Sequence, residues 1–293
     1  MTGPRPTRLY EAYVFDLDGT IYLGDEPLPG AARLVAELRQ RQIPVRFLSN
    51  NATRDPEQYA AKLTALGIET PVSDITNTVV TTIAWLREHR PQAVVFPVAP
   101  PAVTRALAAA GFEVSDDPAR IDVVISSYDT SFDYRKLQVA FDALWRRPDA
   151  VLVETNPDRY CPYPGGRGEP DAAAITAAIE ACTGVRKVAS LGKPEPVMIE
   201  TALADLDVDP ADVVMVGDRL GTDIAMAARA GLASALVLTG DSTREEAAAL
   251  PRGEQPTYVL ERIDELLPAS VWQERGWRGL VQRMAESPGA IPS

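Results

Sequence analysis

Short apolar runs rich in β-branched residues alternate along the chain with longer segments whose apolar residues recur at helical spacing. The runs predict seven strands, at residues 13–18, 45–50, 93–98, 122–127, 150–155, 212–218 and 234–240. Strands that alternate with helices are typical of parallel sheets. We therefore expect an α/β fold, a Rossmann-like doubly wound parallel sheet with helices on both faces.

Capping residues predict where several helices begin and end. Asp55 and Pro56 are expected as the N-cap and first residue of a helix that Gly67 ends. Asp171 and Gly184 bracket another helix in the same way. These limits agree with the spacing of the apolar residues between them.

The chemically suggestive residues are unevenly distributed. Residues 1–76 and 184–293 contain nearly all of them, whereas residues 77–183 have their own strands and helices but few such motifs. No flexible linker divides the chain. The pattern predicts a catalytic core formed by 1–76 plus 184–293, with 77–183 inserted as a smaller α/β cap domain.

The segment after Leu267 has apolar residues at helical spacing: Trp277, Leu280, Val281 and Met284. Such a stripe is expected to pack on its own domain. A contact in a homodimer is the alternative.

Composition narrows the possible partners and the compartment. The formal net charge of -12 argues against nucleic acid or an anionic membrane as a main partner. No run approaches the roughly eighteen apolar residues of a membrane span, and the N-terminal segment lacks the pattern of a signal peptide. We expect a cytoplasmic protein.

The chain has too few histidines and cysteines for the zinc sites or disulfide frameworks that these residues commonly form. His89 is the only histidine and falls at a predicted helix C-terminus, where a solvated histidine is ordinary. Cys161 and Cys182 lack a second pair, so neither a zinc ribbon nor a disulfide framework follows. Cys182 is expected in the core because it lies on a stripe with Ile175 and Ile179.

Two aspartates end the first predicted strand, in the run VFDLDGT. If the strand continues through them, Asp16 and Asp18 point to the same face. Like charges so close raise one pKa strongly unless a cation or proton intervenes. An N-cap or Asx turn explains one aspartate but not both. Paired carboxylates at the carboxyl end of a parallel strand indicate a functional site.

Further polar groups follow the other strands. Ser49, Asn50 and Asn51 end the second predicted strand with hydroxyl, amide and backbone donors suited to an oxyanion. Lys193, one of four lysines against 25 arginines, is held between a glycine and a proline. Its ammonium suits holding a carboxylate and a phosphoryl group together, although a solvated loop lysine is the alternative.

A third set of carboxylates comes late in the chain. Asp218 ends the strand at 212–218, and Asp223 follows at the start of the next helix, where an N-cap is its ordinary role. Asp218 near Asp16 and Asp18 would make a hard, oxygen-only site, which favours magnesium over zinc.

These motifs together resemble a known family. DLDGT, LSNN, GKPEP and GDRLGTD, in this order, closely resemble the four motifs of the haloacid dehalogenase superfamily of phosphatases. The continuation IYLGDEPLPGA and the segment beginning NPDRY are similar to subfamily IIA, which has a large inserted α/β cap. The resemblance covers about residues 12–267.

The resemblance implies a mechanism. Asp16 would attack phosphorus and form an aspartyl-phosphate, and Asp18 would act as acid and then base. Mg²⁺ would be held by Asp16, the backbone carbonyl of Asp18 and Asp218. Asp223 would either bind the metal directly or hold one of the groups that bind it. Ser49 and Lys193 would hold the phosphoryl oxygens.

The implied activity is hydrolysis of a small phosphate ester. Sugar, polyol or nucleotide phosphates are the expected substrates, and p-nitrophenyl phosphate the expected artificial one. The cap would select the leaving group, with Arg159 and Cys161 as candidate contacts. Transfer of the phosphoryl group to another acceptor and a non-enzymatic, receiver-like interaction protein are the alternatives.

Overall fold

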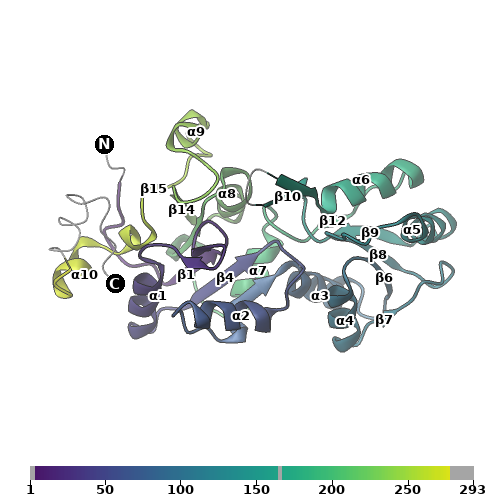
Figure 1. Ribbon diagram of the computed structural model, residues 1–293, viewed down its shortest axis with the longest axis horizontal. Coiled ribbons are helices and arrows are strands. Elements are labelled where there is room, and N and C mark those ends of the chain that lie inside the picture. The colour runs from purple at the N-terminus through teal and green to yellow at the C-terminus, as the bar shows by residue number, and fades with distance from the viewer. Residues whose placement is uncertain (1–3, 164–166, 278–293) are drawn as a thin grey trace.

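The molecule is built on two parallel sheets, each covered by helices on both faces (Figure 1). The computed structural model of the chain describes residues 4–163 and 167–277. The first sheet has six strands in the order β15-β14-β13-β1-β4-β5. Its strands are β1 (Ala12–Asp16), β4 (Val45–Ser49), β5 (Ile75–Asn77), β13 (Val213–Gly217), β14 (Ala233–Val237) and β15 (Tyr258–Leu260).

Apolar side chains of the first sheet alternate between two cores. One core joins Tyr13 and Phe15 of β1 to the helices on one side. The other joins Ala12 and Val14 to the opposite side. The first side has α1 (Ala31–Gln40), α2 (Pro56–Ala65) and α10 (Ala269–Glu274), and the second has α7 (Val197–Leu203) and α8 (Ala225–Ala230).

The second sheet has five strands in the order β12-β9-β8-β6-β7. They are β6 (Val94–Val98), β7 (Glu113–Val114), β8 (Val123–Ser126), β9 (Val151–Glu154) and β12 (Ala189–Ser190). Helices α3 (Thr78–His89) and α4 (Pro101–Ala109) cover one face, and α5 (Tyr134–Arg146) and α6 (Ala172–Thr183) the other. Figure 1 shows α5 and α6 at the end of the molecule opposite α1 and α10.

The remaining elements are short. Two hairpins pair β2 (Tyr22–Leu23) with β3 (Glu26–Pro27) and β10 (Tyr160–Tyr163) with β11 (Arg167–Pro170). Helix α9 (Arg244–Ala249) follows β14, and the single turns are Val72–Asp74, Pro210–Asp212, Leu220–Ile224 and Ile263–Leu266.

The predicted elements are confirmed. All seven predicted strands occur, six of them within two residues of their expected limits, whereas β14 ends at Val237, three residues before the predicted end at 240. The strands within each large sheet are parallel. Asp55 caps α2 through a capping box with Gln58. Asp171 is the N-cap of α6, and Gly184 ends that helix with a left-handed φ of 72°.

The chain leaves the first sheet after β5 and returns to it at β13. Strand β12 still pairs with β9, although it lies beyond residue 183. We therefore propose an inserted cap whose second boundary lies between Ser190 and Lys193 rather than at 183.

Two expectations for apolar residues need separate comment. The expectation for Cys182 is wrong because its side chain is exposed. Ile175 and Ile179 are buried, and Thr183, one turn after Ile179, takes the next inward position. Trp277 packs against the core beside Trp272. Leu280, Val281 and Met284 lie outside the described residues.

His89 is the last residue of α3, as predicted, and stacks on Trp85. Across the described part of the chain, none of the helices has the length and apolar character required to span a bilayer.

Candidate active site

The polar residues singled out in the sequence lie at the carboxyl edge of the first sheet. Asp16 is the last residue of β1, Ser49 is the last of β4, and Asp218 directly follows β13. These three strands are neighbours in the order β13-β1-β4. Because they are parallel, their carboxyl ends meet, at the place where α/β proteins bind ligands.

Three buried carboxylates gather at this edge. One oxygen each from Asp16, Asp218 and Asp223 lies within 4.8 Å of the others. Asp223 arrives on the turn Leu220–Ile224, and its carboxylate accepts a hydrogen bond from the amide of Arg219. Nζ of Lys193 donates to Asp16 and, at 2.7 Å, to Asp223. The predicted convergence of Lys193 with Asp16 is therefore present, with Asp223 as a third member.

Burial and mutual repulsion perturb these groups. Burial raises the pKa of Asp16 well above its usual range, Lys193 opposes that rise, and Asp223 and Asp218 add to it. Burial and the Asp223 carboxylate raise the pKa of Asp218 to about 6. Burial lowers the pKa of Lys193, but Asp16 and Asp223 outweigh it and raise the pKa overall. One ammonium therefore does not neutralise three carboxylates, and a cation would stabilise the cluster.

The donor set fits a hard divalent cation. Oδ1 of Asp218 is buried without a hydrogen-bond partner, whereas Oδ2 accepts the amide of Asp241 at 2.8 Å. A buried carboxylate oxygen without a partner is costly unless a ligand satisfies it. A methyl group at Gly240 would overlap the Asp218 carboxylate, so glycine is required for the backbone at position 240 to lie this close to Asp218. The residues fit Mg²⁺, which prefers carboxylate oxygen.

Asp18 occupies a different position from the one its spacing suggests. Strand β1 ends at Asp16, so strand alternation does not orient Asp18. Its carboxylate is outside the three-carboxylate cluster, is exposed within the cleft and accepts from the Tyr22 hydroxyl at 3.4 Å. The cleft walls raise its pKa by desolvation, against the opposing charges of Lys62 and Arg54. Asp18 is thus placed to exchange protons.

The residues after β4 have distinct partners. Ser49 Oγ lies 3.1 Å from the Tyr59 hydroxyl and accepts from the amide of Asn51 at 3.2 Å. Asn51 accepts from the amide and hydroxyl of Thr53. The Asn50 side chain bonds instead to the backbone of Lys193 and to a cap residue. Ser49 and Asn51 line the cleft with Asn50, but the polar groups of the Asn50 side chain are already engaged.

A cleft of about 960 Å³ extends from the carboxylates to the cap. Cys161 lines it, and burial together with Asp171 raises the pKa of its thiol to about 11. Arg159 is exposed and is absent from the cleft lining, so the proposal below leaves it out. The cap side of the cleft is formed by Tyr128, Asp158, Tyr160, Cys161 and Asp171.

Proteins of known families resemble this chain in sequence. Residues 13–113 match the haloacid dehalogenase-like hydrolase family, and residues 190–266 match the HAD-hydrolase-like family. An acid sugar phosphatase from Staphylococcus saprophyticus is 35% identical over 258 residues, covering 88% of this chain and 97% of the relative. The chain belongs to the haloacid dehalogenase superfamily.

Solved structures place the chain in subfamily IIA. A mutant thermostable NPPase from Geobacillus stearothermophilus has 36% identity and a TM-score of 0.78, covering 88% of this chain and 98% of that one. NagD from E. coli has 26% identity and a TM-score of 0.77, with the same coverage. The predicted family and fold are confirmed, and the chain is a phosphatase, a hydrolase of phosphoric monoesters.

Several cleft residues of this haloacid dehalogenase phosphatase were not predicted. Arg54 precedes α2 and Lys62 lies in its last turn, both close in sequence to the Ser49 motif, so proximity could have suggested them. Asp158 stands in the NPDRY segment that the sequence already highlighted. Nothing in the sequence around Tyr128 indicates a role in the cleft, because the fold of the second sheet brings this residue there.

The phosphatase should show a pH-dependent stability that originates at Asp171. Burial raises the pKa of this carboxyl from 3.8 to about 6, despite hydrogen bonds from Ala172 and Asn156. Between these pH values the folded state keeps a proton that the unfolded state has lost. Unfolding free energy therefore falls as pH rises from about 4 to about 6, by roughly 2–3 kcal/mol.

Urea unfolding of wild type and Asp171→Asn across this pH range checks the prediction. The variant keeps an acceptor but cannot ionise, so the wild type should lose free energy of unfolding relative to it and the difference should then level off above about pH 6. Parallel curves would show that Asp171 is not the source.

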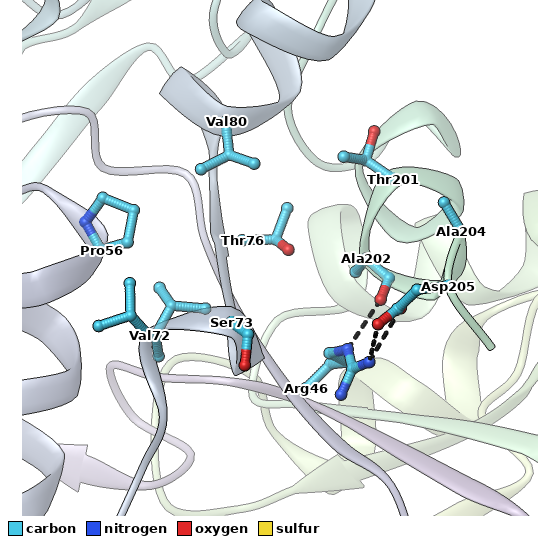
Figure 2. A pocket seen from close by; sticks show the side chains of 11 residues that line it. Arg46, Pro56, Val72, Ser73, Thr76, Val80, Thr201, Ala202, Ala204 and Asp205 are labelled. Carbon is cyan, nitrogen blue, oxygen red and sulfur yellow. Dashed lines mark hydrogen bonds and ion pairs between the residues drawn. The ribbon is translucent and has the colours of Figure 1, made fainter. Parts of the chain in front are cut away.

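A second pocket, of about 340 Å³, lies outside the cleft and is lined mainly by residues of the first domain, with Val80 of α3 (Figure 2). The Arg46 guanidinium donates to both carboxylate oxygens of Asp205 at 2.9 Å and to the carbonyl of Ala202 (Figure 2). It also reaches Asp74 at 3.3 Å. Among the described residues that line this pocket, Arg46 is the only cation, and its guanidinium is already engaged, so they offer no free positive charge for a phosphate.

Proposed function

We propose that the protein is a Mg²⁺-dependent phosphomonoesterase that acts on a small sugar or polyol phosphate through an aspartyl-phosphate at Asp16. One observation carries the proposal: Lys193 bridges Asp16 and Asp223 in a buried cluster where an Asp218 oxygen has no partner. That arrangement leaves places for a cation and for a phosphoryl group beside a carboxylate nucleophile.

In the proposed reaction, a carboxylate oxygen of Asp16 attacks phosphorus and the bond to the leaving oxygen breaks. Asp18, with its raised pKa, gives a proton to that leaving oxygen. It then takes a proton from the water that hydrolyses the Asp16 phosphate, which releases inorganic phosphate, frees the Asp16 carboxylate and returns Asp18 to its protonated form. Ser49 and Lys193 hold the phosphoryl oxygens during both steps.

Asp16, Asp218 and Asp223, with the carbonyl of Asp18, would hold the metal ion. When bound, it would neutralise charge on the carboxylates and on the phosphoryl oxygens. This assignment places the carboxylate of Asp18 outside the metal site and leaves it available for proton transfer.

The cap side of the cleft supports an uncharged leaving group. Its described residues contribute two phenols, a neutral thiol and two carboxylates, and no cation. Hydroxyl groups can hydrogen-bond to such a surface, whereas a carboxylate or second phosphate would be repelled. The acid sugar phosphatase relative supports the same class.

A panel of phosphorylated metabolites tests this proposal. We expect kcat/KM to be higher for sugar and polyol monophosphates than for substrates with a second anionic group. Chelation by EDTA should remove turnover, and added Mg²⁺ should restore it. Undiminished turnover in EDTA would contradict the metal assignment, and a preference for bisphosphates would contradict the leaving-group assignment.

Phosphoryl transfer to an acceptor other than water uses the same groups. Products formed in the presence of added alcohols distinguish it, because transfer gives a new phosphate ester whereas hydrolysis gives only inorganic phosphate. The cytoplasmic location and the homodimer contact remain predictions from the sequence.

A further inference from the structure

We propose that Asp158 of the cap is a positioning residue that holds Lys193 in place through Asn50. The proposal rests on the function given above. It assigns the Asn50 side chain to orienting the lysine rather than to contacting substrate, and it gives the cap a role in the phosphoryl site itself.

Asn50 links three parts of the molecule. Its Oδ1 accepts the amide of Lys193 at 2.8 Å, and its Nδ2 donates to the carbonyl of the same residue at 3.0 Å. The same Nδ2 donates to Oδ2 of Asp158 at 2.8 Å. The paired bonds fix the backbone of Lys193, and the third bond fixes the amide plane of Asn50.

Asp158 is itself held by the cap. Its Oδ2 also accepts from Asn156 Nδ2 at 2.9 Å, and Asn156 donates in turn to Asp171, the N-cap of α6, at 3.1 Å. The carbonyl of Asp158 accepts the amide of Ala173 at 3.1 Å. Asp158 thus joins the start of α6 to the segment that carries the catalytic lysine.

Topology explains why Lys193 needs this support. Strand β12 ends at Ser190 on the edge of the second sheet, and Lys193 follows three residues later in the first domain's cleft. A displacement of the cap therefore reaches the lysine through a very short connection. A methyl group at Gly192 would lie 2.7 Å from both Asn50 Oδ1 and the carbonyl of Thr155, so the connection is clamped between the two domains.

The positioning role predicts which kinetic constants change when the hydrogen bond from Asn50 to Asp158 is removed. Misplacing a catalytic group by about 1 Å can cost roughly 10²-fold in rate. Lys193 would contact the phosphoryl group, which all substrates share, so the loss should not depend on the leaving group. A direct contact between Asp158 and the leaving group would instead change KM and differ between substrates.

The test is a double-mutant cycle with Asp158→Ala and Asn50→Ala. Wild type, both single variants and the double variant are compared by kcat and KM on p-nitrophenyl phosphate and on glycerol phosphate with Mg²⁺. Asp158→Asn keeps an oxygen that can accept from both Asn50 and Asn156. Asp133→Ala is the matched control, because it removes a helix cap of the cap domain at α5, away from the cleft.

We expect Asp158→Ala to lower kcat about 10-fold or more on both substrates, with KM changed less than about 3-fold. Asp158→Asn should recover most of that loss, Asp133→Ala should match wild type, and the double variant should be no slower than Asn50→Ala alone. Circular dichroism of each variant separates a folding defect from a positioning defect.

Three results would overturn the proposal: multiplicative losses in the double variant, a loss confined to one substrate, or wild-type kcat in Asp158→Ala. The proposed function is judged separately in the same assay. If wild type does not release phosphate, the phosphomonoesterase assignment fails; if wild type turns over and the two losses multiply, only the positioning role fails.

Discussion

The Asp16→Asn variant should turn over p-nitrophenyl phosphate at least about 10⁴-fold more slowly than wild type, because an amide cannot form the covalent intermediate that splits the reaction into two steps. The measurement is kcat with Mg²⁺ at saturating substrate. The side chain keeps its size and can still accept a hydrogen bond from Lys193, so the fold should be retained.

Asp74→Asn is the matched control. Asp74 is as buried as Asp16, at 8% exposure, and is bonded to arginines, but it lies away from the cleft. It should lose stability and keep its kcat. A kcat for Asp16→Asn within about 10-fold of the control would remove Asp16 as nucleophile.

The second large effect is expected for Lys193→Met, which should lower kcat by about 10²–10³-fold, because it removes a preorganised positive charge from the phosphoryl site. It also leaves Asp16 and Asp223 without their ion-pair partner, so thermal unfolding should occur at a lower temperature. Melting curves with and without Mg²⁺ measure the second effect, and Mg²⁺ should restore part of the loss.

Lys136→Met is the control for this variant. Lys136 also pairs with a buried aspartate, Asp129, at 2.6 Å, but it lies on the cap outside the cleft. It should destabilise the protein without lowering kcat. If both lysine variants lost activity equally, the loss would reflect stability rather than the phosphoryl site.

Much of the fold could be predicted because local signals agree with it. The positions of the strands and the caps Asp55, Asp171 and Gly184 depend on backbone geometry close by in sequence, and the structure confirms the seven strands and these caps. Short elements could not be predicted. Strand β5 has three residues, and the β10–β11 hairpin contains prolines, so neither shows the alternation of apolar and polar residues that predicts a strand.

Some residues of the site could be predicted from the sequence and others could not. Asp16, Ser49 and Asp218 could be located because the carboxyl ends of parallel strands meet wherever the sheet order brings them together. The partners of Asn50 and the absence of Arg159 from the cleft lining could not be predicted, because both depend on how the cap lies against the core. Asp18 was misjudged as a continuation of the strand, which ends two residues earlier.

Trapping the covalent intermediate tests the central claim most directly. Wild-type protein is mixed with substrate and Mg²⁺, quenched during turnover and reduced with borohydride, which converts an aspartyl-phosphate into homoserine, and the peptide that contains Asp16 is then analysed by mass spectrometry. The account predicts homoserine at position 16, and none when substrate is omitted. Turnover with Asp16 left unmodified, or with homoserine at a different aspartate, would contradict it.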